Sequence, residues 1–192
     1  MALIPKKIDY ILAEMRDTLQ DQQASRWTQR ELYRYLDQAL RHIALATKYN
    51  KIKHTIKTGD VNTDTYTLPY EAIEFYSITP KEAETEAPQP HIILDANTIQ
   101  FPENRDAEVV VEYYAFPKRI VYGVDSEMLL DEDLFDALKY YVLYRAYEKE
   151  ASVENIQKAQ YFMGQYQGIL AMHLTRWHGK FEVISSRTAF LR

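Results

Sequence analysis

The chain has no cysteine, only five glycines, and no long uninterrupted run of apolar residues. Without cysteine, disulfides, thiolate metal sites and cysteine nucleophiles are all excluded. A transmembrane helix needs about 20 predominantly apolar residues, and no window of this sequence approaches that length. The N-terminal residues also lack the apolar core of a signal peptide. We therefore expect a protein made without an export signal and without a membrane partner.

Patterns that support catalysis or cofactor binding are missing as well. The sequence contains no phosphate-binding glycine loop, no nucleophile elbow and no helical pair of histidines. Four acidic residues do cluster at the start of a predicted helix, where a metal site or paired catalytic carboxylates are alternatives: Asp131, Glu132, Asp133 and Asp136. The helix macrodipole favours negative charge at that position, so capping explains the cluster more simply. We predict that the protein is not an enzyme and that it binds no cofactor and no metal.

Tyrosine is abundant, and charge is distributed unevenly along the chain. There are 16 Tyr against seven Phe and two Trp. Tyrosine suits surfaces that become buried only on assembly, and it also suits the margins of a core. Residues 1–58 carry eleven Lys or Arg against six Asp or Glu, whereas residues 59–130 carry four against fourteen. This distribution indicates a molecule whose parts face different partners.

Two amphipathic helices are predicted at the N-terminal end. Pro5 suits the first position of a helix, and apolar residues follow it at helical spacing. A second helix is predicted from about residue 29 to about residue 49, because Thr28 and Glu31 have the spacing of a capping box.

A β-rich segment is predicted after the second helix. Ile52, His54 and Ile56 alternate with lysine and threonine, which is typical of a half-buried strand. Residues 80–90 hold three prolines, three glutamates and no large apolar side chain, so they predict an exposed loop. Similar patterns predict further strands at residues 65–68, 73–79 and 108–114, and a hairpin at residues 92–101.

Two more helices are predicted in the C-terminal part. The third begins near Asp131 and continues to about Glu148, and the fourth is capped by Ser152. The fourth loses its amphipathic pattern near Trp177, and Gly179 is its predicted stop. Two helices at each end therefore bracket an acidic β-rich middle, as in one domain with an insertion and a tail.

Several segments together resemble a known protein family. They are Trp27–Leu32, Tyr66–Pro69, Glu112–Pro117 and Leu129–Glu132, followed by a tyrosine-rich pair of helices. In this combination the chain resembles the head–tail connector (adaptor) proteins of tailed bacteriophages, from near Trp27 to near Trp177.

The resemblance implies an α+β fold that is mainly α, with a four-helix core, a β-rich insertion between the second and third helices, and an extended C-terminal arm. The expected domains are a helical bundle of residues 1–50 and 128–176, an insertion of residues 51–127 and an arm of residues 177–192. The family further implies a ring of about twelve copies beneath the portal. The implied partners are the portal protein ring, the next neck or tail protein, and other copies of the chain. Genomic DNA would pass through the channel without sequence-specific binding, and the protein would reside in the neck of the virion after assembly in the host cytoplasm.

Three groups of residues are candidate contact sites under this resemblance. Tyr140, Tyr144 and Tyr147 lie off the predicted core face and are expected between subunits. Glu82, Glu84 and Glu86 are expected to contact a distal partner or to line the channel, although a solvated loop is the simplest explanation. In similar adaptors a C-terminal arm docks on the portal, which suits strand addition or groove docking here. The corresponding residues are apolar or basic: Arg176, Trp177, Lys180, Phe181, Val183, Ile184, Arg187, Phe190, Leu191 and Arg192. The alternative is that this tail folds back onto its own helices.

Other functions and contacts stay open on the sequence. A stopper or tail-completion protein of the neck is the nearest alternative to an adaptor. A small helical DNA-binding regulator that uses Arg30, Arg34 and Arg41 is an alternative of another class, although a pI near 5.6 opposes it. Gly164 and Gly168 lower the propensity of the fourth helix, which either chance or the close approach of another backbone would explain.

Overall fold

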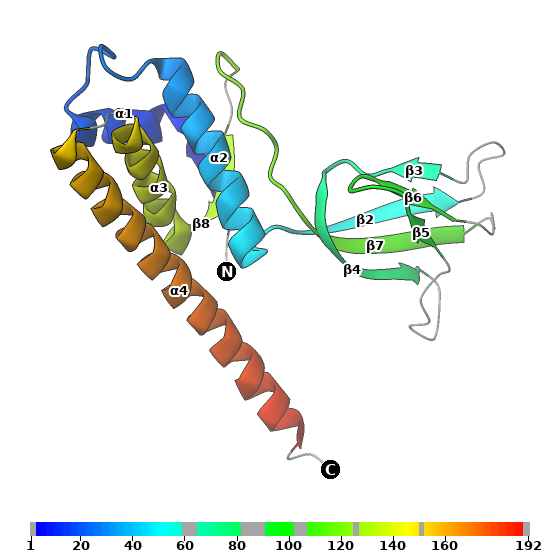
Figure 1. Ribbon diagram of the computed structural model, residues 1–192. Coiled ribbons are helices and arrows are strands. Elements are labelled where there is room, and N and C mark those ends of the chain that lie inside the picture. The colour runs from blue at the N-terminus through cyan, green and yellow to red at the C-terminus, as the bar shows by residue number, and fades with distance from the viewer. Residues whose placement is uncertain are drawn as a thin grey trace. The chain divides into compact units, whose positions relative to one another are not determined.

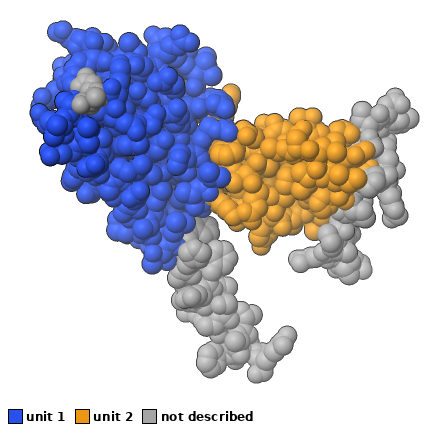
Figure 2. Space-filling model, viewed as in Figure 1, with its two compact units in different colours: residues 1–47, 119–192 blue, residues 48–118 orange. Residues whose placement is uncertain are grey.

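The computed structural model divides the chain into two compact units, coloured separately in Figure 2. Residues 1–47 and 119–192 form the helical unit, and residues 48–118 form the β unit. The structure describes residues 3–58, 65–81, 91–101, 107–124, 127–149 and 152–189. For residues 3–6, 107 and 177–189 it describes the backbone alone. The predicted α+β class is confirmed.

In its described residues, the helical unit contains four α-helices, a short 3-10 helix and a two-stranded sheet (Figure 1). The helix α3 packs against each of the other three helices, and the strands β1 and β8 pair antiparallel. The elements are β1 (Leu3–Lys7), α1 (Ile8–Leu19), α2 (Gln29–Thr47), β8 (Glu127–Asp131), the 3-10 helix (Glu132–Leu134), α3 (Phe135–Glu148) and α4 (Val153–Ala189).

The start of α2 is built as the capping-box spacing predicts. The Thr28 amide donates to the Glu31 carboxylate at 2.9 Å, and the Glu31 amide donates to Thr28 Oγ1 at 3.3 Å. Next to this cap, Trp27 is fully buried and donates from its indole nitrogen to the Ala146 carbonyl of α3 at 2.9 Å. Its ring also meets the Tyr147 ring edge-on, with centroids 5.9 Å apart. The cap and the indole together join the beginning of α2 to the end of α3.

The β unit consists of two three-stranded antiparallel sheets. One has the order β2 (Lys51–Thr58), β7 (Ala107–Ala115), β4 (Ala72–Pro80). The other has the order β3 (Thr65–Thr67), β6 (Thr98–Gln100), β5 (Ile92–Ile93). The strands and the hairpin predicted from alternation are confirmed, with small shifts at their ends.

Side chains from both sheets share one core. Along β7, Val109, Val111 and Tyr113 are all fully buried, because alternate residues of a strand point to the same face. Glu112 lies on the opposite face of β7 and pairs with Lys51 of β2 at 2.7 Å. This alternation explains why the lysines of β2 are exposed in the native fold.

The N-terminus differs from the sequence-based prediction. Pro5 does not begin a helix, because it lies in β1 opposite Leu129 of β8, and α1 begins only at Ile8. Both strands of a two-stranded sheet are edge strands, and edge strands are where proline is found within sheets.

The start of the third helix is also more complex than predicted. A strand, β8, occupies residues 127–131, and a 3-10 turn precedes α3. The predicted capping role of Asp131 is nevertheless confirmed, since its carboxylate accepts a hydrogen bond from the Asp133 amide at 3.4 Å.

The C-terminal arm is helical over most of its length, so the predicted extended arm is wrong. The backbone of α4 continues past Trp177 and Gly179 to Ala189. No proline follows Pro117 in the sequence. A single glycine costs a helix only about 1 kcal/mol, and each further residue adds a hydrogen bond to a helix that has already formed. Residues 190–192 lie outside the described part of the chain.

Candidate assembly surfaces

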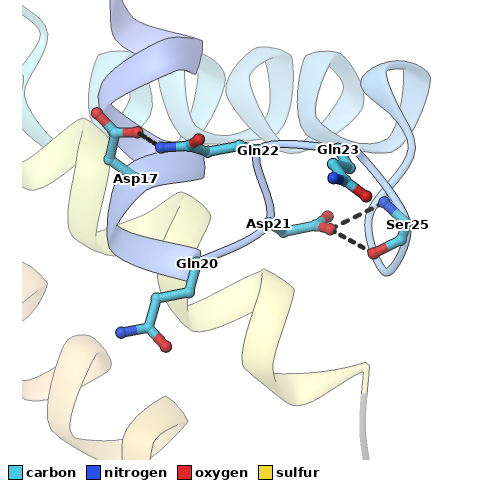
Figure 3. Close-up of a pocket in the computed structure, with 6 residues that line it drawn as sticks. All are labelled: Asp17, Gln20, Asp21, Gln22, Gln23 and Ser25. Atoms are coloured by element: carbon cyan, nitrogen blue, oxygen red, sulfur yellow. Dashed lines mark hydrogen bonds between the residues drawn. The ribbon is translucent and has the colours of Figure 1, made fainter.

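A polar hollow of about 400 Å³ lies at the loop between α1 and α2 and is lined by Asp17, Asp21, Ser25 and three glutamines (Figure 3). The Asp21 side chain is 1% exposed, and its oxygens accept hydrogen bonds from the Ser25 amide at 2.8 Å, Ser25 Oγ at 2.9 Å and the Trp27 amide at 2.9 Å. Burial opposes ionisation, but the hydrogen bonds outweigh it and lower the pKa of Asp21 to about 2. From the other side, the Arg16 guanidinium donates to the Asp21 and Trp27 carbonyls.

These contacts give the loop a structural role. The Asp21 carboxylate uses its acceptor capacity on backbone amides, on the Ser25 hydroxyl and on Arg16, whose guanidinium lies 3.5 Å away. The hollow therefore supports the fold and offers no free ligand group from Asp21.

A groove of about 700 Å³ lies between α2 and residues 119–122. The Asp37 carboxylate holds these residues against α2 by accepting from the Ile120 amide at 3.0 Å and from Arg119 at 3.2 Å. The Tyr122 ring meets the Tyr33 ring edge-on, with centroids 5.3 Å apart. Two exposed arginines of α2, Arg30 and Arg34, also line this groove. The result is a basic surface with an exposed apolar wall, since Val121 and Tyr122 are 54% and 55% exposed.

The helix α4 has two contrasting faces. Its inner face packs on the unit through buried residues that include Asn155, Ala159 and Tyr166. Its first turns carry the exposed ion pair of Glu154 and Lys158. From residue 159 to residue 175 its outer face is exposed and uncharged, and it consists of Tyr161, Gly164, Gly168, Ala171, Met172 and Thr175. The sequence has no Lys, Arg, Asp or Glu from residue 159 to residue 175.

An exposed helix face normally carries charged residues. A solvent-exposed face with none, but with tyrosine, methionine and small residues, has the composition of a protein–protein contact. A Cβ built on Gly164 or Gly168 would meet nothing within 4 Å, so packing among the described residues does not explain these glycines.

The structure places the three candidate tyrosines in different environments. Tyr147 is only 8% exposed, stacks on the Phe162 ring at 5.7 Å and contacts Trp27, so the expectation that it lies off the core is wrong. It faces inward because α4 packs directly over this part of α3. Tyr140 is half-buried and also stacks on Phe162, at 6.0 Å. Tyr144 is half-buried and donates from its hydroxyl to Glu148 at 2.9 Å.

The other predicted contact residues lie mostly outside the described side chains. Glu82, Glu84 and Glu86 belong to residues 82–90, which the structure does not describe. Of the arm residues only Arg176 has a described side chain, and it pairs with Asp133 at 2.7 Å. This ion pair joins α4 to the 3-10 helix of the same unit.

The chain matches the model of one protein family over most of its length. The model described as SU10 adaptor protein matches residues 8–183, nearly the whole chain. The chain belongs to the SU10 adaptor protein family. This is a phage head–tail adaptor family, so the resemblance inferred from the sequence is confirmed. A search of curated proteins found no match.

Membership of the SU10 adaptor family places the chain among structural components of phage virions rather than among enzymes. Within the described residues, no group of three or more His, Asp or Glu side chains is arranged to hold a metal ion. No helix in that part of the chain is both long and apolar enough to cross a membrane.

Neither the groove nor the outer face of α4 is among the contact sites predicted from the sequence. The groove has no local signal, because it joins α2 to residues 82 or more positions further along the chain. The outer face does have one: the charge-free stretch of residues 159–175 is visible in the sequence and indicates an unusual helix surface.

Proposed function

We propose that this SU10 adaptor family member forms a ring beneath the portal, extends the DNA channel and docks the next neck or tail protein. The ring would contain about twelve copies, matching the portal above it. The helical unit would form the body of the ring, and the β unit would carry contacts to another neck component. Genomic DNA would pass through without sequence-specific recognition.

The observation that supports assembly best is the outer face of α4. From residue 159 to residue 175, nearly five turns of the helix, it carries no charged side chain. Water solvates such a face poorly compared with a charged one, and its glycines allow another backbone to come close. A neighbouring copy packed along it would bury Tyr161 and Met172, which are 61% and 57% exposed in the single chain.

The end of α4 and the residues after it form the proposed portal contact. Residues 177–192 combine three aromatic residues with three cationic ones. Because the backbone to Ala189 is helical, docking would follow the mode of a helix laid into a groove rather than strand addition.

The direct test is the native mass of the purified protein, alone and mixed with the portal ring encoded by the same phage. We expect addition of about twelve copies per portal ring. A stopper or tail-completion protein would leave the portal unchanged and bind a tail component instead. Absence of any complex with the portal would therefore refute the proposed position in the neck.

A truncated chain that ends at Arg176 isolates the contribution of the C-terminal segment. It keeps the Arg176–Asp133 ion pair and the whole described inner face of α4, so it should fold as the full chain does. Circular dichroism should show the same thermal midpoint, while binding to the portal ring should be lost. Portal binding at the full-length level would refute the docking role of residues 177–192.

A further inference from the structure

The groove on α2 has a chemistry that none of the roles above uses. We propose that the surface formed by Arg30, Arg34, Val121 and Tyr122 binds the acidic segment Glu82–Glu86 of another copy of this chain. This inference rests on the proposed function to the extent that copies of the chain must meet.

The positive charge of the groove is available for a partner. Its two carboxylates are already engaged, since Glu31 pairs with Lys149 at 2.8 Å and Asp37 pairs with Arg119 at 3.2 Å. Among the described residues, neither Arg30 nor Arg34 has an ion-pair partner. An additional carboxylate would therefore meet two exposed guanidinium groups without displacing an internal ion pair, and guanidinium groups bind carboxylates through paired hydrogen bonds.

The spacing of the charges also matches. Arg30 and Arg34 are four residues apart on a helix, which places them on one face and separates them by about 6 Å along the axis. Glutamates at every second position of an extended segment point to one side and stand about 6.6 Å apart. The sequence Glu82-Ala83-Glu84-Thr85-Glu86 has this alternation. Two successive carboxylates would thus face two successive guanidinium groups.

The apolar part of the groove matches the residues that lie between the glutamates of the segment. Val121 and Tyr122 offer exposed apolar surface beside the arginines. Between the glutamates, the segment has only the small residues Ala83 and Thr85, which fit against a flat wall without needing a deep pocket. The occupant that this surface fits is therefore acidic, narrow and extended.

A contact of this kind has the symmetry that a ring requires. The groove belongs to the helical unit, whereas residues 82–86 belong to the β unit. Pairing one with the other between copies uses two different surfaces, which is a heterologous contact and repeats around a ring until it closes.

Disulfide trapping tests the pairing directly, because the natural chain has no cysteine. One preparation would carry Arg34→Cys and the other Glu84→Cys, and the two would be mixed and oxidised, with and without the portal ring. We expect a disulfide-linked heterodimer by intact mass, in clear excess over a control pair. The control would combine Glu84→Cys with Lys57→Cys, whose side chain is 82% exposed on β2. Arg30→Glu introduced into the Arg34→Cys chain should reduce the yield, and Glu82→Arg in the partner should restore it.

The other outcomes would overturn the inference. A heterodimer yield no higher than that of the control, under both conditions, would exclude the pairing. A chain carrying both cysteines that closes on itself as a monomer, with no cross-linking between copies, would show that the segment binds its own groove. Since portal binding of the natural chain is measured separately, failure of the trapping leaves the proposed neck position intact.

Discussion

Replacement of Asp21 by asparagine tests how the loop between α1 and α2 is held. The hydrogen bonds from Ser25, Arg26 and Trp27 lower the pKa of Asp21 from 3.8 to about 2. That difference corresponds to about 2 kcal/mol of folding free energy, and because the loop lies at the surface, solvent screening reduces the expected value to about 1 to 2 kcal/mol. Asparagine keeps the size of the side chain but brings an NH₂ group toward backbone amides that need an acceptor.

The stabilisation depends on pH in a direction set by the lowered pKa. Because the folded-state pKa of Asp21 lies below the unfolded value of 3.8, the carboxylate stabilises the protein fully above about pH 5. This contribution is lost as the pH falls from about 4 to about 2. Asp21→Asn should therefore lower the free energy of unfolding at pH 7. The difference in this free energy between the variant and the natural protein should become smaller as the pH is lowered.

The assay is urea unfolding followed by Trp27 fluorescence, in a Trp177→Phe background so that one tryptophan reports. Asp17→Asn is the matched control, since the Asp17 carboxylate accepts from the exposed Gln22 side chain at 2.9 Å. Asp17→Asn should change the free energy of unfolding by no more than about 0.5 kcal/mol. Equal losses for Asp21→Asn and Asp17→Asn, or a gap that does not change between pH 7 and pH 3, would refute the reasoning.

Two further predictions concern tyrosines and glycines of α3 and α4. Tyr147→Ala should cost about 3 kcal/mol in urea unfolding because it empties a site between Trp27 and Phe162, whereas Tyr144→Ala should cost about 1 kcal/mol or less; equal costs would contradict the assigned packing. The double variant Gly164→Ala/Gly168→Ala should raise the stability of the single chain by about 1 to 2 kcal/mol, since both positions are open, helical and exposed. If a neighbouring backbone packs closely there, the same variant should reduce the number of copies bound to the portal ring in native mass measurements. Full assembly of the stabilised variant would show that the glycines serve no close contact.

The elements that short-range patterns predicted correctly are those whose signals lie within the element itself. The Thr28–Glu31 cap places the start of α2, and alternation along β2 and β7 identifies their buried faces. These patterns follow from the side-chain periods of helices and strands, 3.6 and 2 residues, which can be recognised within a short stretch of sequence.

The incorrect predictions concern segments whose structure depends on contacts with residues far away in the sequence. Pro5 suits a helix start and a sheet edge equally well, and pairing with residues 127–131 decided for the strand. The prediction that the fourth helix stops at Gly179 rested on the low helix propensity of one glycine. That cost is too small to end a helix that has already formed, and α4 continues to Ala189. Tyr147 was expected at an interface, but the packing of α4 over α3 buried it.

The class of the fold, the family and the absence of cysteine chemistry follow from the amino-acid sequence, because composition and local periodicity depend only on residues close together in the chain. Which surfaces stay exposed depends on how the elements pack in the folded chain. The groove between α2 and residues 119–122, and the uncharged outer face of α4, exist because the other faces of these helices are used by the core. A residue's exposure depends on which distant segments pack against it, and that is a property of the folded chain alone.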